Sequence, residues 1–381
     1  MRDLPAHGLA RGGEGTRHVT RVDVIVAALN EQQHLAACLR SIQRQRKVDL
    51  GLIVVDDGST DQTTVIARAA AAADDRVHVI RHESPRGLAI ARNAGLAAAT
   101  APWVTFVDGD DFLLPGALRS RLEQLADAPS DTVGAYGDWI SVPERMPLLP
   151  VRRRAARRPD VWMVPAGKGV PFIASAPVIA REIVEELGGF DPRWKTGEDA
   201  EFWRWWLRLQ ARTVYTPHLC VAYRRRTNSM RRRDPGGHYR ANRDAFAALD
   251  LPLPNDAPAG VLTATDATYR TAAAHQSRGL WGGALGLAEG QDDEVDRLLA
   301  ELDPVALRLG DPSVLAAQAS ATARRRVRGT KRNRDLLARL DATAPSLRER
   351  VSAAAAPRAS RAELRDAAAW LRGCRELPGE G

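Results

Sequence analysis

The sequence predicts an α/β fold with a mostly parallel β-sheet, followed by a C-terminal α-helical region. Short apolar runs alternate with helical patterns through the first 130 residues, an order typical of βαβ units with right-handed crossovers. Several of the apolar runs end directly in acidic or polar residues. From about residue 236, Ala, Leu and Arg recur at helical spacing.

The apolar runs give the expected strands. They are residues 22–29, 52–55, 77–80, 103–107 and 133–142. The runs are too short for helices, which suits strands covered on both faces. Helices are expected to begin near Glu31, Ser59, Leu88 and Pro115, and Ser59 with Gln62 forms a capping-box pattern. A further helix from Arg181 is expected to end at a pair of glycines.

Polar groups follow three of these strands, at Asn30-Glu31, Asp56-Asp57 and Asp108 to Asp111. Because the carboxyl ends of parallel strands meet at one edge of the sheet, these groups are expected to gather there. Closely spaced aspartates repel one another and suit a hard cation such as Mg²⁺ or Mn²⁺. Ordinary turn and cap roles are the alternative, above all for Asp56 and Asp111.

Composition limits the class of protein. No stretch approaches 18 consecutive apolar residues, and the first 20 residues lack the apolar core of a signal peptide. The three cysteines are scattered and form no CxxC pair, so a cytoplasmic protein is expected. The net charge of +8 favours anionic partners. The GxGxxG and P-loop motifs of other nucleotide-binding proteins are missing.

Four motifs, in their order and spacing, resemble the family 2 glycosyltransferases of the GT-A fold. They are Val24-Ile25-Val26 to Asn30-Glu31, Val54-Val55-Asp56-Asp57-Gly58-Ser59-Thr60-Asp61, Ala91-Arg92-Asn93-Ala94-Gly95 and Phe106-Val107-Asp108-Gly109-Asp110-Asp111. The resemblance covers about residues 20–230. It implies a Rossmann-like GT-A sheet and a hexosyltransferase-like enzyme that uses a nucleoside-diphosphate sugar.

The resemblance also implies how the donor is bound. Asp57 would accept a hydrogen bond from the base, Asn30 and Glu31 would line the nucleoside pocket, and Arg92 would approach the nucleotide. A helix-surface arginine is the alternative for Arg92. Asp108 would face the ribose and the metal.

The metal implied by the resemblance is Mn²⁺ or Mg²⁺. Asp110 would bind it together with Asp108, and the ion would bridge the diphosphate. One departure concerns this site, because Arg226 stands where a histidine of the family segment Tyr-Arg-x-His-x-x-Ser would be. A guanidinium cannot bind a cation, but it can hold a diphosphate through paired hydrogen bonds.

The pair Glu198-Asp199 follows a Gly-Gly-Phe-Asp turn and resembles the catalytic-base motif of the family. The resemblance implies that Asp199 is the base, with Glu198 as the neighbouring carboxylate. Acidic residues at a helix start also favour the helix dipole, which is the alternative interpretation. Burial beside the aromatic residues that follow can raise a carboxylate pKa toward the value that a general base needs.

Three regions are expected along the chain: a disordered tail at 1–20, a GT-A catalytic domain at 21–235 and a helical region at 236–381. The proline-punctuated residues 143–165 contain arginine runs and are a candidate acceptor loop, with a solvated basic loop as the alternative. Further arginines lie at 324–334. We expect them to contact an anionic membrane peripherally, on its inner face. The alternative is that the C-terminal helices form a homo-oligomer or packing module in which these arginines are merely solvated.

The expected function is inverting transfer of a sugar to an acceptor hydroxyl, in the synthesis of cell-surface polysaccharide or a glycoconjugate. The acceptor, which the sequence does not identify, would be a saccharide, a lipid-linked molecule or a polymer. A metal-dependent nucleotidyltransferase is one alternative, but Asn30-Glu31-Gln32-Gln33 stands where its glycine-rich basic loop would be. A nucleic-acid-binding protein is another, although the arginine runs lack interleaved aromatic residues.

Overall fold

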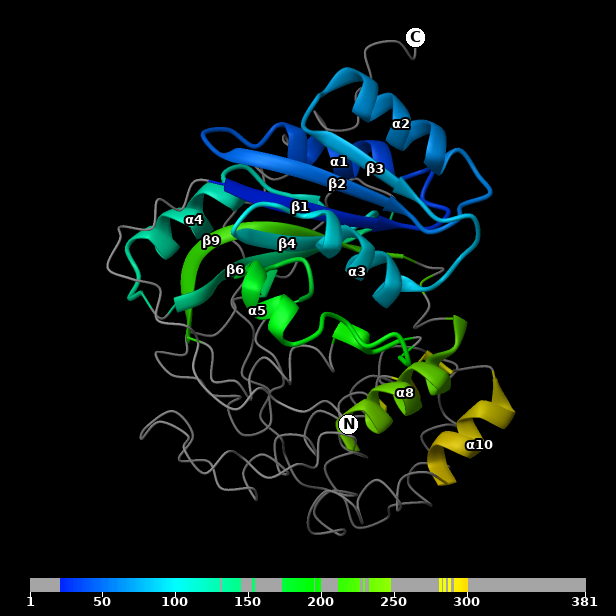
Figure 1. Cartoon of the computed structure of the whole chain (residues 1–381). Helices are drawn as coiled ribbons and strands as arrows, with labels where there is room; N and C mark the ends of the chain where they lie inside the picture. Colours follow the sequence, from blue (N-terminus) through cyan, green and yellow to red (C-terminus); the bar gives the residue numbers. More distant parts are fainter. Residues whose placement is uncertain are drawn as a thin grey trace. The chain divides into compact units, whose positions relative to one another are not determined.

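The computed structural model describes residues 21–130, 132–144, 153–154, 173–194, 196–199, 212–226, 229 and 233–247, and parts of 281–300. These residues divide between two compact units, the first ending at Arg226 (Figure 1). The predicted tail at 1–20, nearly all of the basic loop and the arginines at 324–334 lie outside the described residues. The predicted domain boundaries therefore stay predictions.

In the described part of the first unit, nine strands form one sheet in the order β3-β2-β1-β4-β8-β6-β9-β5, with β7 paired to β6. The four strands that come first in the sequence pair in parallel, which confirms the predicted parallel sheet. It consists of β1 (Arg21–Ala28), β2 (Asp49–Asp56), β3 (Val77–Arg81) and β4 (Trp103–Asp108).

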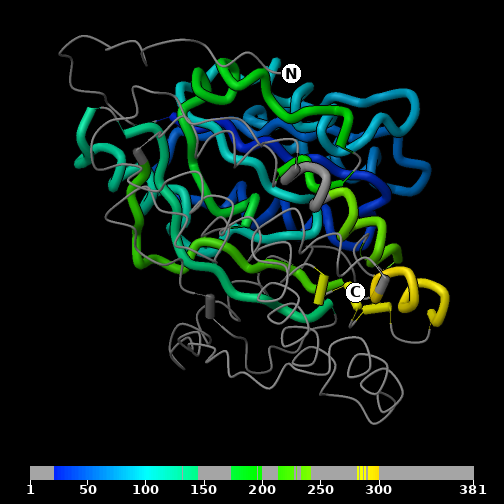
Figure 2. The backbone as a smooth tube through the Cα atoms, turned by 90° about the horizontal axis from the view of Figure 1, so that it is seen from below, coloured from blue at the N-terminus to red at the C-terminus, as the bar shows by residue number. Residues whose placement is uncertain are grey.

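The other half of the sheet is mixed. It contains β5 (Phe112–Leu113), β6 (Thr132–Pro143), β7 (Arg153–Arg154), β8 (Val178–Ala180) and β9 (Arg212–Arg225). The long strands β6 and β9 run parallel and side by side (Figure 2). Each antiparallel pairing extends over only two residue pairs, so the sheet is mostly parallel, as expected.

Helices cover both faces of the parallel half. The helices α1 (Leu35–Gln43) and α2 (Thr63–Ala73) lie on one face, and α3 (Leu88–Ala98) lies on the other (Figure 1). Gly95 lets α3 approach the sheet closely, because a Cβ atom there would lie 2.3 Å from Cγ2 of Ile25. This contact sets the height of α3, and so of its side chains, above β1.

Two predicted helix starts are wrong. The helix α2 begins at Thr63 rather than at Ser59, and its N-cap residue makes no side-chain capping bond. Ser59 instead donates its main-chain N–H to Asp56 and accepts a bond from Asn30, so tertiary contacts override the capping-box pattern. The helix α1 likewise begins at Leu35, four residues after Glu31, whereas α4 (Ala117–Ala126) begins near Pro115, as expected. The helix α5 (Arg181–Glu186) ends as predicted at Gly188 and Gly189, which both have positive φ.

Asp23 is the one polar residue within the apolar run of β1, and it is buried. Its Oδ2 accepts hydrogen bonds from the main-chain N–H groups of Thr100 (2.6 Å) and Ala101 (2.8 Å). Gly51 on the neighbouring strand leaves room for this carboxylate. Asp23 thus holds the connection into β4, the strand that carries the aspartate cluster.

In the second unit, the described helices are α8 (Pro235–Ala247) and α10 (Asp292–Ala300), with short helical pieces near Trp281. Arg240 of α8 donates to Glu294 of α10 over 3.0 Å. The buried Trp281 donates its Nε1–H to the main-chain oxygen of Leu298. None of the helices in the described residues has the length and apolar character to cross a membrane.

Candidate active site

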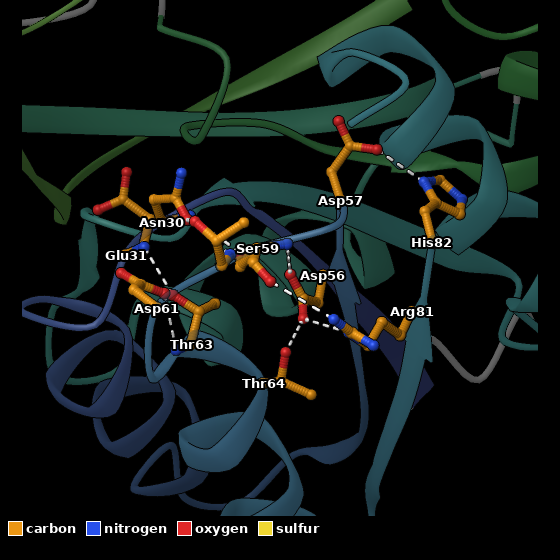
Figure 3. Close-up of polar contacts among 11 residues, drawn as sticks. Asn30, Glu31, Asp56, Asp57, Ser59, Asp61, Thr63, Thr64, Arg81 and His82 are labelled. Atoms are coloured by element: carbon orange, nitrogen blue, oxygen red, sulfur yellow. Dashed lines mark hydrogen bonds and ion pairs between the residues drawn. The ribbon is translucent and has the colours of Figure 1, made fainter. Parts of the chain in front are cut away.

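The polar loops after β1 and β2 are joined side by side (Figure 3). The N–H of Asn30 donates to Ser59 Oγ (2.9 Å), and Asn30 Oδ1 accepts from the N–H of Thr60 (3.0 Å). The N–H of Glu31 donates to Thr63 Oγ1 over 2.7 Å. Asn30 adopts φ 55, a left-handed conformation that asparagine tolerates better than most residues. The structure thus brings Asn30 and Glu31 next to the Asp-Gly-Ser turn, as expected.

Asp56 is fully buried and organises that turn. It accepts hydrogen bonds from the N–H of Ser59 (2.9 Å) and from the hydroxyl of Thr64, and Arg81 Nε lies 3.4 Å away. Burial alone would raise the pKa of Asp56, but the bonds from Ser59 and Thr64 hold it below its ordinary value. The environment of Asp56 therefore fits the alternative interpretation, in which this residue stabilises the turn.

Asp57 anchors the loop at residues 82–87. Its Oδ1 lies 2.7 Å from His82 Nδ1, and it accepts bonds from the N–H groups of Arg86 (3.0 Å) and Gly87 (2.8 Å). Gly58 is required beside it, because a Cβ atom there would lie 2.4 Å from the main-chain carbon of Ser84. A carboxylate offers about four acceptor positions, so a bound base would share Asp57 with these three donors.

The aspartates after β4 have different environments. Asp111 is fully buried and accepts bonds from Ser175 Oγ (2.8 Å) and from the N–H of Arg224 (3.0 Å). Burial, with the nearby charges of Asp110 and Asp108, raises the pKa of Asp111 well above its ordinary value. Asp111 therefore links the loop after β4 to β9, and it is Asp108 and Asp110 that face the site.

Asp110 and Glu31 lie close enough to repel each other. Burial and Asp108 raise the pKa of Asp110 to about 6, and burial and Asp110 raise the pKa of Glu31 to about 7. The guanidinium of Arg226 pairs with Glu31 Oε1 and lies 3.4 Å from Asp110 Oδ2. The structure thus places Arg226 beside these two carboxylates.

Two aspartates of this site could hold a hard divalent cation. Asp108 and Asp110 offer carboxylate oxygens at the end of β4, and the Oε2 atom of nearby Glu31 is buried without a hydrogen-bond partner. Within the described residues, no three His, Cys, Asp or Glu side chains are arranged to hold a metal ion. The two aspartates would therefore be the protein ligands, and water and phosphate oxygens would complete the shell, as Mg²⁺ commonly requires.

Arg92 is buried at the centre of the site. Its Nη2 donates to Asp108 Oδ1 (2.8 Å), its Nη1 donates to Glu198 Oε1 (2.7 Å), and its guanidinium lies 5.1 Å from the ring centre of Phe190. Burial would lower the pKa of Arg92, but Asp108 and Glu198 raise it. The helix-surface alternative is wrong. Arg92 connects the aspartate cluster to the predicted base motif.

Asn93, the next residue of α3, belongs to one of the four motifs, but the sequence analysis assigned it no role. It forms a pair of hydrogen bonds with the main chain of Phe190. A polar residue beside Arg92 in a helix of mostly small apolar residues was the available signal. The two neighbours hold the segment that leads to Glu198 against the sheet.

Glu198 and Asp199 differ in exposure. Glu198 is buried against Arg92, and burial raises its pKa to about 7 although Arg92 lowers it. Asp199 is only partly buried. The residues that follow, 200–211, lie outside the described residues, including the tryptophans after Phe202. Glu198 is therefore held by Arg92, and Asp199 is the more exposed of the two carboxylates.

Arg224 is a second residue that the sequence analysis did not assign a role. It is buried, donates from Nε to the main-chain oxygen of Asp110 (2.9 Å) and from Nη1 to that of Glu144 (3.1 Å), and lies over the ring of Phe112. It therefore fixes the backbone of the loop after β4, while Arg226 pairs with Glu31 and lies near Asp110.

Comparisons with known proteins agree with the resemblance of the sequence motifs. Residues 23–162 match the model of glycosyl transferase family 2. The chain is 33% identical over 136 residues to the uncharacterized glycosyltransferase EpsJ of Bacillus subtilis, a match that covers 36% of this chain and 39% of EpsJ. It is 37% identical over 105 residues to the succinoglycan biosynthesis protein ExoU of Rhizobium meliloti, covering 28% of this chain and 30% of ExoU. Both matches span less than half of the relative.

The structure is similar to the crystal structure of S. aureus TarS 1-349 in complex with UDP-GlcNAc. The TM-score is 0.51 at 15% sequence identity, with 83% of this chain and 92% of that chain covered. At this identity the likeness shows the fold alone. The resemblance seen in the four sequence motifs is confirmed for residues 23–162, which belong to glycosyl transferase family 2, and the fold is the GT-A fold.

Proposed function

We propose that this protein transfers a sugar from a nucleoside-diphosphate sugar to an acceptor hydroxyl, with inversion at the anomeric carbon. One observation carries the proposal: the buried Arg92 joins Asp108, on the donor side, to Glu198, beside the predicted base Asp199. Such a bridge fixes the distance between the group that meets the donor and the group that meets the acceptor. Positioning of this kind is a large part of the catalysis of a reaction between two substrates.

Asn30, Glu31 and Asp57 are proposed to form the nucleoside pocket. They come from loops that hydrogen bonds hold together. Mn²⁺ or Mg²⁺ would be held by Asp108 and Asp110, and when bound it would supply positive charge to the departing diphosphate. Arg226 lies close enough to the same loop to pair with diphosphate oxygens.

Asp199 is proposed to take the proton from the acceptor hydroxyl, so that the oxygen attacks the anomeric carbon from the face opposite the diphosphate. Glu198 keeps Arg92 in place and does not itself contact the acceptor, because its carboxylate is buried against the guanidinium. A single displacement of this kind needs no covalent intermediate with the protein.

The acceptor is proposed to belong to a cell-surface polysaccharide or glycoconjugate. The support is the relative ExoU, whose name places it in succinoglycan biosynthesis. A peripheral position on an anionic membrane and an oligomer through the C-terminal helices stay predictions, since the residues concerned lie outside the described ones. The family match favours this transferase over a nucleotidyltransferase or a nucleic-acid-binding protein.

A thermal-shift panel of nucleoside diphosphates and their sugars, with and without Mn²⁺, tests the proposal and includes UDP-GlcNAc as one donor. A ligand at about 100 times its dissociation constant adds roughly 2.7 kcal/mol of stability. Asp110→Ala should lose the Mn²⁺-dependent part of the shift, while the exposed Asp75→Ala keeps it. If no nucleotide or sugar nucleotide stabilises the protein, the proposal fails.

A further inference from the structure

Three strand ends far apart in the sequence bring one cation and two carboxylates together. Glu31 follows β1, Asp110 follows β4 and Arg226 follows β9. The Nη1 atom of Arg226 pairs with Glu31 Oε1 and lies 3.4 Å from Asp110 Oδ2. The side chains are 22%, 11% and 17% exposed for Arg226, Glu31 and Asp110, so solvent screens these charges only in part.

The arrangement leaves polar atoms unsatisfied. The Oε2 atom of Glu31 and the Nε atom of Arg226 are both buried and have no hydrogen-bond partner. A buried polar atom without a partner is unfavourable. The pair therefore has one free acceptor, Glu31 Oε2, and one free donor, Arg226 Nε, beside Asp110. A cation could bind the acceptor and a ligand oxygen could bind the donor.

A guanidinium stays charged in proteins, so Arg226 cannot leave Asp110 by losing its proton. It must move to another anion if a divalent cation is to approach the same carboxylate without repulsion. A diphosphate is such an anion, because its oxygens match the paired N–H groups of a guanidinium.

We propose that Arg226 is a built-in cation that neutralises Asp110 and Glu31 in the donor-free protein and moves to the diphosphate when the donor binds. This inference rests on the proposed function. Arg226 and the metal compete for Asp110, so the free protein binds the metal weakly. The diphosphate draws Arg226 away and strengthens metal binding, and by linkage the metal strengthens diphosphate binding by the same factor.

Mn²⁺ titration followed by the electron paramagnetic resonance signal of the free ion tests the competition without any turnover. In the absence of nucleotide, Arg226→Gln should bind Mn²⁺ about tenfold more tightly than wild type, within the 5–150-fold range typical of coupled sites. The matched control is Arg225→Gln, which removes the same charge from an exposed neighbour. It should change the Mn²⁺ affinity less than about twofold, since exposed charges are screened.

The second titration adds the nucleoside diphosphate that gives the largest shift in the thermal panel. Wild type should then bind Mn²⁺ about tenfold more tightly than without the nucleotide, and Arg226→Gln should lose most of this gain. Asp110→Asn introduced into Arg226→Gln should abolish the extra Mn²⁺ affinity, because it removes the carboxylate for which the two cations compete.

The inference is overturned if Arg226→Gln binds Mn²⁺ no more tightly than wild type, or if no variant binds Mn²⁺ at all. It is also overturned if the gain survives Asp110→Asn. If circular dichroism shows that Arg226→Gln is poorly folded, Arg226→Lys takes its place. This variant keeps the charge but not the paired N–H groups, and it should still bind Mn²⁺ more tightly than wild type does. If no nucleotide stabilises the protein but Arg226→Gln binds Mn²⁺ more tightly than wild type, the proposed function is rejected, and the competition between Arg226 and the metal is supported.

Discussion

The side chain of Asn93 and the main chain of Phe190 exchange two hydrogen bonds across 97 residues of sequence. Nδ2 donates to the oxygen of Phe190 over 2.7 Å, and the N–H of Phe190 donates to Oδ1 over 2.8 Å. Gly189 leaves room for the amide, because a Cβ atom there would lie 2.4 Å from Oδ1. The helix that carries Arg92 is thus attached to the segment that carries Glu198.

Asn93→Ala should lower the free energy of unfolding by about 1–3 kcal/mol, because it leaves the main-chain groups of Phe190 without their partner. The turnover number should fall more than donor affinity, since the base segment loses its attachment while the nucleoside pocket is untouched. Urea unfolding and steady-state kinetics measure the two effects. Wild-type stability together with wild-type turnover would show that the attachment does not matter.

Asp199→Asn keeps the size of the side chain and removes its ability to accept a proton. The turnover number should fall by about 10² to 10⁴, the usual contribution of a general base, while the affinity for the donor stays near that of wild type. Asp75→Asn, at an exposed site, is the control. Unchanged turnover in Asp199→Asn would assign proton transfer to another group.

Glu198 makes stability depend on pH. Its folded pKa of about 7 lies above its ordinary value of 4.5, so the folded state binds the proton more tightly than the unfolded state does. The resulting stabilisation is complete below pH 4.5 and is lost as the pH rises through 7. Glu198→Gln lacks this titration, so the stability of wild type relative to the variant should fall between these values, by on the order of 3 kcal/mol. The free energy of unfolding of both proteins is measured with urea at each pH. A difference between them that does not change with pH would reject the assignment of this titration to Glu198.

Gly58→Ala and Gly87→Ala separate crowding from backbone strain. Both glycines have positive φ, at 77° and 103°, where the backbone strain of an alanine is on the order of 1–3 kcal/mol. An added Cβ meets Ser84 at 2.4 Å in the first case and nothing within 4 Å in the second. Gly58→Ala should therefore be the more destabilising variant, and it should also weaken nucleotide binding. Equal losses in unfolding free energy would show that the close approach is relieved at no cost.

The parallel half of the sheet was predictable because its strands are continuous apolar runs with polar ends. The short strands β5 and β8 were not, since two or three residues carry no periodicity. At the site, the sequence indicated which loops meet, but not how residues pair across them. Arg92 was recognised from its motif, whereas its bonds to Asp108 and Glu198 arise from packing between segments 16 and 106 residues away. The helix start at Ser59 failed for the same reason, because its partner Asn30 lies in another loop.

Asp57 holds the loop at residues 82–87 partly through main-chain N–H groups, so the path of the loop does not depend on the side chain of Arg86. Arg86 gives Asp57 only its main-chain N–H, and its own side chain is exposed. Position 86 can therefore accept many residue types while the loop keeps its path, provided that the new residue has a main-chain N–H. A substitution at this single position can therefore change the charge and size of an exposed side chain beside Asp57 while the main-chain contacts of the loop stay in place.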